Sequence, residues 1–345
     1  MKRAILLFFG IAVLVLIPIL AVTASQGAPP ASQAGAIADA ADDYLNSSTT
    51  VLNMSGESLC ANLLDGNLDN DPFILSIRSP DDYAVGHIPG AINMSAGSLF
   101  EPDNLAKLPK DEKIVVYCYT GHTGSQVSAL LNLCGYDATN LTWGIMGWTK
   151  DTSVATKQFS NPATDLPTET TVNEPTATYD LPTANATSAD ASGIARAACD
   201  EYASAGFKNI KADDLYSLIT DDDPANDPLI VSVRGAEDYA KGHVPGAINI
   251  PLAGIGKEEN LQKLDPSREI VVYCYTGRTG SQATAILNAL GYDAVNLLWG
   301  ISGWTTDSVV APKRFNPDTS VDYPFETGAG EEVPSAPSGG GGGCG

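Results

Sequence analysis

The sequence is poor in metal-binding residues and in cationic residues. It has three histidines and six cysteines among 345 residues, and no two cysteines show the CxxC spacing of zinc sites. The pattern therefore predicts neither a metal site nor another cofactor. Lysine and arginine number 19 against 41 acidic residues, which gives a net charge of −22. This balance argues against nucleic acid or an anionic membrane surface as a partner, although a locally positive site could still bind a small anion.

The N-terminus combines two cationic residues with an apolar run from Ala4 to Val22. The tripeptide Val22-Thr23-Ala24 resembles a cleavage site, so residues 1–24 are predicted to be a secretory signal peptide. The run is also near the length that crosses a bilayer, so an uncleaved membrane anchor is the alternative. Both alternatives place the rest of the chain outside the cytoplasm, as a secreted, periplasmic or cell-surface protein.

The chain contains an internal duplication. A shift of 156 residues aligns residues 53–159 with residues 209–315 without a gap. The stretches IVVYCYTGHTGSQ (114–126) and IVVYCYTGRTGSQ (270–282) differ only at one position, which is His122 in the first and Arg278 in the second. So long a period indicates a duplicated domain rather than a solenoid. We expect domains at 36–159 and 193–320, a Thr/Pro/Ala-rich linker at 160–192, and a flexible glycine-rich tail at 321–345 that contains Cys344.

Within each half, short apolar runs alternate with segments of helical periodicity. The runs PFILSIR and KIVVYC, with their counterparts PLIVSVR and EIVVYC, are typical of buried strands. The segments SGESLCANLL and GSQVSALLNLCGY, with KADDLYSLI and GSQATAILNALGY, have the spacing of helices. Because strands that alternate with helices form parallel sheets, the sequence predicts an α/β fold. We expect two tandem domains, each with a mostly parallel central sheet flanked by helices on both faces.

In each half a predicted buried strand ends in a cysteine, Cys118 or Cys274, followed by a glycine-containing loop and then a helix. Backbone N–H groups in such a loop and the positive end of the helix stabilise a thiolate, which is the reactive form of cysteine. A buried cysteine without a chemical role is the alternative, but the polar loop occurs twice, which argues against it. The predicted substrate-binding loops comprise Tyr119, Thr120, Gly121, His122 and Thr123 in the first half, and Tyr275, Thr276, Gly277, Arg278 and Thr279 in the second.

The two loops are expected to differ in charge. Arg278 gives the second site a fixed positive charge, which suits an anionic sulfur donor. The charge of His122 should instead depend on pH. We therefore expect activity at Cys118 to fall more steeply than activity at Cys274 between mild acid and mild base.

Three motifs in each half resemble those of the rhodanese, or sulfurtransferase, family. They are GHIPGAIN and GHVPGAIN, YCYTGHTGS and YCYTGRTGS, and GYDATNLTWGIMGW and GYDAVNLLWGISGW. The resemblance implies that Cys118 and Cys274 carry a sulfane sulfur as a persulfide. It implies thiosulfate or polysulfide as the donor and a thiol, cyanide or a protein as the acceptor. The chain departs from the family in two ways: many members have Asp where Ser76 and Ser232 stand, and well-known two-domain members keep the cysteine only in the second half.

Other functions remain open on the sequence alone. A persulfide carrier, which delivers sulfur only to a dedicated protein partner, is the main alternative to an enzyme. A structural protein on a disused scaffold is a third, but both active loops are intact. Phosphatase chemistry is disfavoured because it needs an arginine six positions after the cysteine, where Gly124 and Gly280 stand. Cys344 is a candidate relay that would accept sulfur from Cys274, or else a tail thiol without a function.

The remaining notable side chains are expected to be structural. The resemblance to the rhodanese family implies that His87 and His243 each fix a turn. Arg78 and Arg234 are expected to make internal hydrogen bonds. The cysteines outside the two loops and the tail are expected to fill packing positions, and their spacing does not support a disulfide between them. These are Cys60, Cys134 and Cys199.

Overall fold

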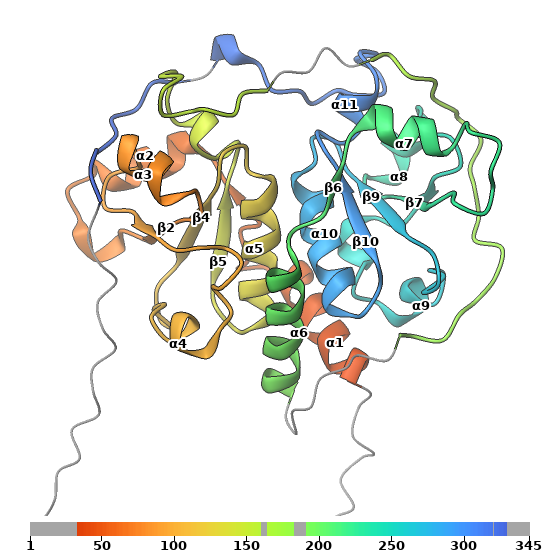
Figure 1. The fold of residues 1–345 in the computed structure, drawn as a ribbon, viewed down its shortest axis with the longest axis horizontal. Coiled ribbons are helices and arrows are strands. Elements are labelled where there is room, and N and C mark those ends of the chain that lie inside the picture. Colours follow the sequence, from red (N-terminus) through yellow and green to blue (C-terminus); the bar gives the residue numbers. More distant parts are fainter. Residues whose placement is uncertain (1–32, 160–163, 183–190, 320, 330–345) are drawn as a thin grey trace, which may run out of the picture. The chain divides into compact units, whose positions relative to one another are not determined.

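Two parallel five-stranded sheets, one in each half of the chain, form the fold in a computed structural model that describes residues 33–159, 164–182, 191–319 and 321–329 (Figure 1). The strand order is β1-β5-β4-β2-β3 in the first sheet and β6-β10-β9-β7-β8 in the second. The prediction of two tandem α/β domains is confirmed. The predicted signal peptide or anchor at residues 1–24 and Cys344 lie outside the described residues. None of the helices within the described ranges is both long and apolar enough to cross a membrane.

The two halves contain the same strands and most of the same helices. The first half comprises α1 (Gln33–Asn46), β1 (Asn53–Met54), α2 (Gly56–Leu63), η1 (Leu68–Asn70), β2 (Phe73–Ser76), α3 (Pro80–Val85), β3 (Ile92–Asn93), α4 (Pro102–Leu105), β4 (Ile114–Tyr117), α5 (His122–Leu133), β5 (Ala138–Leu141) and η2 (Gly144–Gly147). The second half comprises α6 (Ala191–Ala205), β6 (Asn209–Ile210), α7 (Ala212–Leu218), β7 (Leu229–Ser232), α8 (Ala236–Ala240), β8 (Ile248–Asn249), η3 (Leu252–Gly254), α9 (Glu258–Leu261), β9 (Ile270–Tyr273), α10 (Arg278–Ala289), β10 (Ala294–Leu297), α11 (Ile301–Trp304) and η4 (Pro317–Thr319).

Both faces of each sheet are covered, as the apolar strands require. In β4, Ile114 and Val116 belong to one hydrophobic core, whereas Val115 and Tyr117 belong to another. Residues of α5 pack in the first core, and residues of α2, α3 and η2 pack in the second. The second half repeats this arrangement, with α10 on one face and α7, α8 and α11 on the other. Because successive strand residues point to opposite faces, a strand that is apolar throughout must be buried on both.

The α5 face of the first sheet and the α10 face of the second share one hydrophobic core. Helices α1 and α6, with which the two domains begin, also pack in this core and contact the opposite domain. From α1, Asn46 Nδ2 donates to Ala253 O at 3.0 Å. From α6, Tyr202 Oη donates to Gln126 Oε1 at 2.5 Å. The two domains are therefore joined by a continuous apolar interface, and each of these helices contacts the other domain.

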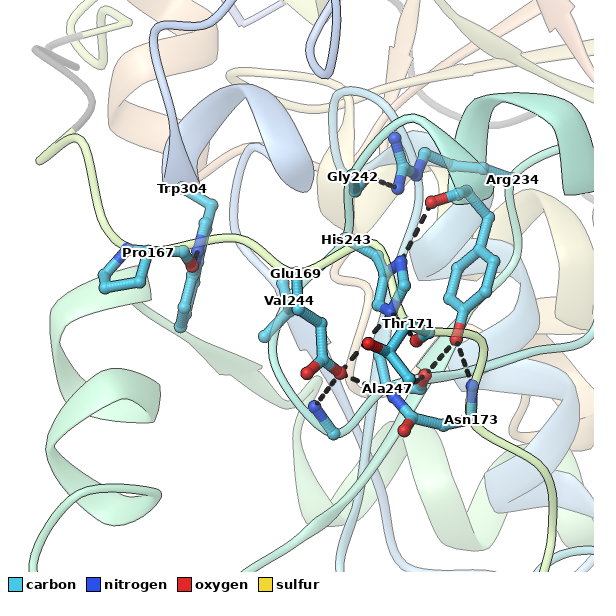
Figure 2. Close-up of polar contacts among 12 residues, drawn as sticks. Pro167, Glu169, Thr171, Asn173, Arg234, Gly242, His243, Val244, Ala247 and Trp304 are labelled. Carbon is cyan, nitrogen blue, oxygen red and sulfur yellow. Dashed lines mark hydrogen bonds and ion pairs between the residues drawn. The ribbon is translucent and has the colours of Figure 1, made fainter.

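Two extended segments lie along the domains and accept hydrogen bonds from the indole N–H groups of buried tryptophans. Residues 164–182 lie on the second domain, where Trp304 Nε1 donates to Pro167 O at 2.7 Å (Figure 2). Residues 321–329 lie on the first domain, where Trp148 Nε1 donates to Pro324 O at 2.8 Å. Residues 321–329 are predicted above to begin a flexible tail, and here the structure differs. A buried indole N–H needs an acceptor, and this segment provides it.

Candidate active site

Each candidate cysteine lies between the end of a buried strand and the start of a twelve-residue helix. Cys118 follows β4 and is 4% exposed, and Cys274 follows β9 and is 2% exposed. The backbone N–H of Gly121 donates to Cys118 Sγ at 3.1 Å, and that of Gly277 donates to Cys274 Sγ at 3.1 Å. These N–H groups lie at the N-termini of α5 and α10, where the helix dipole favours negative charge. Each sulfur therefore accepts a backbone hydrogen bond at the start of a helix.

The loop around each sulfur is held in place by a neighbouring turn. Gly121 adopts a left-handed conformation, with φ of 87°, which glycine allows at little cost. Gly144, with φ of 55°, packs directly on the cysteine, because a Cβ added to it would lie 2.4 Å from Cys118 O. The next residue, Ile145, donates its N–H to Cys118 O at 3.0 Å. Backbone groups from two segments therefore fix the position of Cys118, and the equivalent residues do the same for Cys274.

A tyrosine, an aspartate and a lysine flank the first cysteine. Tyr119 Oη donates to Asp82 Oδ2, and Lys157 Nζ lies 3.9 Å from the centre of the Tyr119 ring. The hydrogen bond from Tyr119, followed by one from Ser79, lowers the pKa of the Asp82 carboxyl. The exposed Lys157 therefore places a positive charge beside the residue that follows the cysteine.

The second half repeats this group of side chains. Tyr275 Oη donates to Asp238 Oδ2 at 2.5 Å, and Lys313 Nζ lies 4.3 Å from the Tyr275 ring centre. Neither the lysines nor the aspartates are among the site residues predicted from the sequence. A signal was present, because the 156-residue shift pairs Lys157 with Lys313 and Asp82 with Asp238. The lysines are distant in sequence from the cysteines, so only the fold brings them to the loops.

His122 does not carry the pH-dependent charge expected from the sequence. It is 3% exposed, and burial followed by the charge of Arg278 lowers its pKa to about 3. Its Nδ1 lies 2.9 Å from Thr120 Oγ1, and its Nε2 lies 3.2 Å from Thr276 O and 3.3 Å from Trp299 N. Either neutral tautomer thus has a partner on both nitrogens. The imidazole is neutral between mild acid and mild base, so the expectation that His122 changes charge in this range is wrong. His122 therefore gives no basis for the steeper pH profile predicted at Cys118.

Arg278 is partly buried at the domain interface. Its Cζ lies 3.9 Å from the centre of the Trp143 ring, in the opposite domain. Burial lowers its pKa to about 10, and the charge of Cys274 opposes that shift. The guanidinium remains positive at neutral pH. Its NH1 group is buried and has no hydrogen-bond partner among the residues that the structure describes.

A cavity of about 550 Å³ lies beside the first loop, between the two domains. Thr120 and His122 line it from the first domain, and Trp299 lines it from the second. Lys157 and Lys211 add two cationic side chains to its wall, and Asp213 adds one carboxylate. A small anion or the end of a larger acceptor therefore has both space and positive charge close to the Cys118 loop. Thr123 and Thr279, also predicted as loop residues, lie in the first turns of α5 and α10.

The side chains expected to be structural make internal hydrogen bonds. Arg78 NH1 donates to Gly86 O at 2.7 Å, and its NH2 donates to Val154 O at 2.8 Å. His87 Nδ1 lies 3.0 Å from Tyr83 O, and the two rings stack. Arg234 and His243 make the equivalent contacts in the second domain (Figure 2). These bonds go to backbone carbonyl groups of the surrounding turns and not to the cysteine sulfurs.

Comparisons with known proteins match this geometry. The chain matches the family described as "Rhodanese-like domain" at residues 60–151 and again at 211–307. It is 38% identical over 71 residues to the thiosulfate sulfurtransferase PspE of Escherichia coli, which is 21% of this chain and 68% of that protein. It is 33% identical over 98 residues to a sulfurtransferase of Allochromatium vinosum, covering 28% of this chain and 87% of that protein. It is 35% identical over 77 residues to YrkF of Bacillus subtilis, a candidate sulfur carrier protein, and this match covers 22% of this chain but only 40% of that protein.

Proposed function

Because the chain belongs to the rhodanese family, we propose that it is a sulfurtransferase that carries sulfane sulfur as a persulfide on Cys118 and on Cys274. The observation that supports this most directly is the hydrogen bond from the backbone N–H of Gly121 to Cys118 Sγ. The backbone N–H of Gly277 makes the same hydrogen bond to Cys274 Sγ. A thiolate held at a helix N-terminus is a competent nucleophile, and the same groups can stabilise the terminal sulfur of a persulfide.

The proposed donor is thiosulfate or polysulfide, and the proposed acceptor is a thiol or cyanide. With thiosulfate, the cysteine thiolate attacks the outer sulfur, a new S–S bond forms, and the donor S–S bond breaks. Sulfite leaves with the electron pair of that bond. The acceptor then attacks the outer sulfur of the persulfide, and the cysteine thiolate is released. Lys157 and Lys313 would attract the anionic donor, since each places a positive charge beside the tyrosine that follows the cysteine.

The test is thiocyanate formation from thiosulfate and cyanide. We expect each of Cys118→Ser and Cys274→Ser to retain turnover from the other site, and the double variant to have none. Persulfide loading, measured by intact mass after thiosulfate treatment, should follow the same pattern. Turnover in the double variant would refute the assignment of both cysteines.

A persulfide carrier with little turnover on small acceptors is the second candidate. The deep burial of both sulfurs favours it, because a buried persulfide is protected from free acceptors. The similarity to YrkF is consistent with it. Stable loading from thiosulfate without release to cyanide would support the carrier, whereas release at every turnover would support the enzyme.

We also propose that the protein acts outside the cytoplasm, since residues 1–24 have the composition of a signal peptide or anchor. Cell fractionation tests this directly. Recovery of the chain from the extracytoplasmic or membrane fraction is expected, and recovery from the cytosol alone would contradict the proposal. The mass of the N-terminal peptide then distinguishes cleavage near Ala24 from an intact anchor.

A further inference from the structure

We propose that the two active loops position each other across the domain interface, with His122 acting as a positioning residue for the Cys274 loop and Arg278 for the Cys118 loop. This inference rests on the proposed function and deepens it. Neither sulfur site would be complete in a single domain. The one difference between the two motifs, His122 against Arg278, would then be two complementary residues rather than a chance substitution in one copy.

His122 belongs to the first motif but contacts the second loop. Its Nε2 lies 3.2 Å from the carbonyl oxygen of Thr276, which is two residues after Cys274. A Cβ added to Gly277 would lie 2.4 Å from the same nitrogen. Gly277 is the residue whose N–H binds Cys274 Sγ. The imidazole therefore packs directly against the backbone that holds the opposite thiolate.

His122 also supports the second loop through Trp299. The Trp299 N–H lies 3.3 Å from His122 Nε2, and the two rings meet edge to face with centroids 4.6 Å apart. Trp299 precedes Gly300, for which an added Cβ would lie 2.4 Å from Cys274 O. Both backbone segments that fix Cys274 are thus in contact with one side chain from the other domain.

Arg278 makes the reciprocal contacts with the first loop. Its guanidinium lies over Trp143, the residue before Gly144, which packs on Cys118 O. Its Cδ lies 3.4 Å from the position that a Cβ on Gly121 would take. Gly121 is the residue whose N–H binds Cys118 Sγ. The side chain of Arg278 therefore packs against the Cys118 loop, with its guanidinium over Trp143.

The identities of the two residues complement each other. The charge of Arg278 reaches His122, where it is one of the causes that keep the imidazole neutral. Two arginines at these positions would bury like charges close together, which is unfavourable where little water screens them. Two histidines would remove the cation from the Trp143 ring. A neutral His122 and a cationic Arg278 therefore avoid the repulsion between two cations and keep a cation over the Trp143 ring.

Alkylation of the full-length chain tests the proposal, because peptide mass spectrometry reads the rates at Cys118 and Cys274 in the same sample. We expect His122→Ala to slow alkylation at Cys274 by about tenfold, and Arg278→Ala to slow it at Cys118 by a similar factor, as for loss of a hydrogen bond or ion contact in a buried site. Tyr202→Phe is the matched control, since it removes a different interdomain hydrogen bond, that to Gln126. It should leave both rates within twofold of the parent chain.

The exchanged pair distinguishes positioning from a general loss of stability. His122→Arg alone should slow both cysteines, and His122→Arg combined with Arg278→His should recover most of the rate. Thermal unfolding of each variant shows whether the chain remains folded at the assay temperature. If His122→Ala slows Cys118 alone, or if the exchanged pair is no better than His122→Arg, the proposal is wrong. Alkylation does not require sulfur transfer, so this outcome is separable from failure of the proposed function.

A second inference concerns two cysteines away from the active loops. The N–H of Cys134 donates to Leu130 O at 3.1 Å, and Cys199 Sγ lies 3.6 Å from the same oxygen. Cys134 caps the end of α5 and Cys199 lies in α6. Burial, followed by the hydrogen bond with the Cys134 thiol, raises the pKa of Cys199. The fold has thus brought together two thiols that sequence spacing did not connect.

The surroundings of this pair differ for its two members. Cys199 is fully buried, whereas Cys134 is partly exposed and lines a cavity of about 330 Å³ together with Lys110 and Arg196. The alignment of the halves places Leu290 opposite Cys134, so the second half lacks this pair.

We infer that Cys134 and Cys199 close into a disulfide when the chain meets a low-molecular-weight disulfide as oxidant. The Cys134 thiolate attacks the oxidant and forms a mixed disulfide, which releases one thiol. Cys199 then loses its proton and attacks Cys134 Sγ, which releases the second thiol. The protein loses two electrons and two protons, and the oxidant is reduced to two thiols. The resulting bond ties α5 of the first domain to α6.

Oxidised glutathione is the probe, applied to a Cys118→Ser, Cys274→Ser chain so that the active-loop thiols do not compete. A non-reduced peptide map is expected to contain a Cys134–Cys199 cross-link, and the oxidised chain is expected to unfold at a higher temperature than the reduced one. With Cys199→Ser added, glutathione should remain attached to Cys134. A stable glutathione adduct on Cys134 while Cys199 is present, or no reaction at either thiol, would overturn the inference.

Discussion

Gly144→Ala is the substitution that tests most directly how the loop holds its sulfur. Gly144 has φ of 55°, and an alanine Cβ there would lie 2.4 Å from Cys118 O and 3.0 Å from the Gly121 N. Both neighbours are backbone atoms, so they cannot move aside as a flexible side chain would. The substitution therefore displaces the loop whose N–H binds the thiolate.

The magnitude follows from two separate effects. An alanine in the left-handed region costs about 1–2 kcal/mol. Overpacking against a fixed neighbour adds about 1–3 kcal/mol. We expect Gly144→Ala to lower the free energy of unfolding by about 2–5 kcal/mol. Gly135→Ala is the control, because Gly135 has φ of 79° but no atom within 4 Å of the added Cβ. It should show the first effect alone.

The assay combines urea denaturation with alkylation of each cysteine. A displacement of about 1 Å in a reactive site can cost about a hundredfold in rate. Gly144→Ala should therefore slow Cys118 by more than tenfold and slow Cys274 by much less, while Gly135→Ala leaves both thiols unchanged. If Gly144→Ala were no more destabilising than Gly135→Ala and left Cys118 equally reactive, the described packing of the loop would be refuted.

Three further predictions concern His122, the two lysines beside the loops, and residues 321–329. The pKa of His122 is about 3 in the folded chain and near 6.5 when unfolded, so the unfolded chain binds the additional proton and stability falls as pH drops below about 6.5. When the pH falls from 7 to 5, the free energy of unfolding measured by urea denaturation should decrease by about 2 kcal/mol more for the parent chain than for His122→Asn. Equal decreases in the two chains would contradict the burial of the imidazole. Lys157→Met and Lys313→Met should each raise KM for thiosulfate about fivefold at the adjacent cysteine, because a surface cation at contact distance contributes about 1 kcal/mol to binding. Each KM is measured in a chain in which the other active-loop cysteine is replaced. An unchanged KM would show that the lysines do not bind the donor. A chain ended at residue 319 should have a first domain less stable by about 1–3 kcal/mol, since Trp148 Nε1 loses its acceptor. Hydrogen exchange around Trp148 that is no faster in the shortened chain than in the full chain would contradict this role of residues 321–329.

The sequence predicted the fold of each half because the relevant signals are local. The apolar run before Cys118 is typical of a strand buried on both faces, and the glycine-containing segment after it is typical of a loop that leads into a helix. The position of the sulfur at the N-terminus of α5 follows from these neighbours alone. The duplication then implied a second copy of the same geometry at Cys274.

The role of the two differing residues could not be derived in this way. Side-chain type indicated that His122 would titrate, but burial at the interface keeps it neutral. Arg278 has the charge beside Cys274 that was predicted, but its contact with Trp143 of the first domain could not be derived from the sequence. The same holds for Lys157, which is 39 positions from Cys118 in sequence yet lies over Tyr119. Cys134 and Cys199 also become neighbours only when α6 packs on α5.

The sequence by itself determined the two sheets, their covering helices and the two cysteines at the strand ends, since neighbouring residues along the chain specify each of these. The tertiary structure alone decided which residues of one domain lie against the other, which charges are removed from water, and which backbone acceptors the buried tryptophans find. These properties depend on the packing of residues that are far apart in the chain, and the energies of burial and of charge interaction are set by that packing.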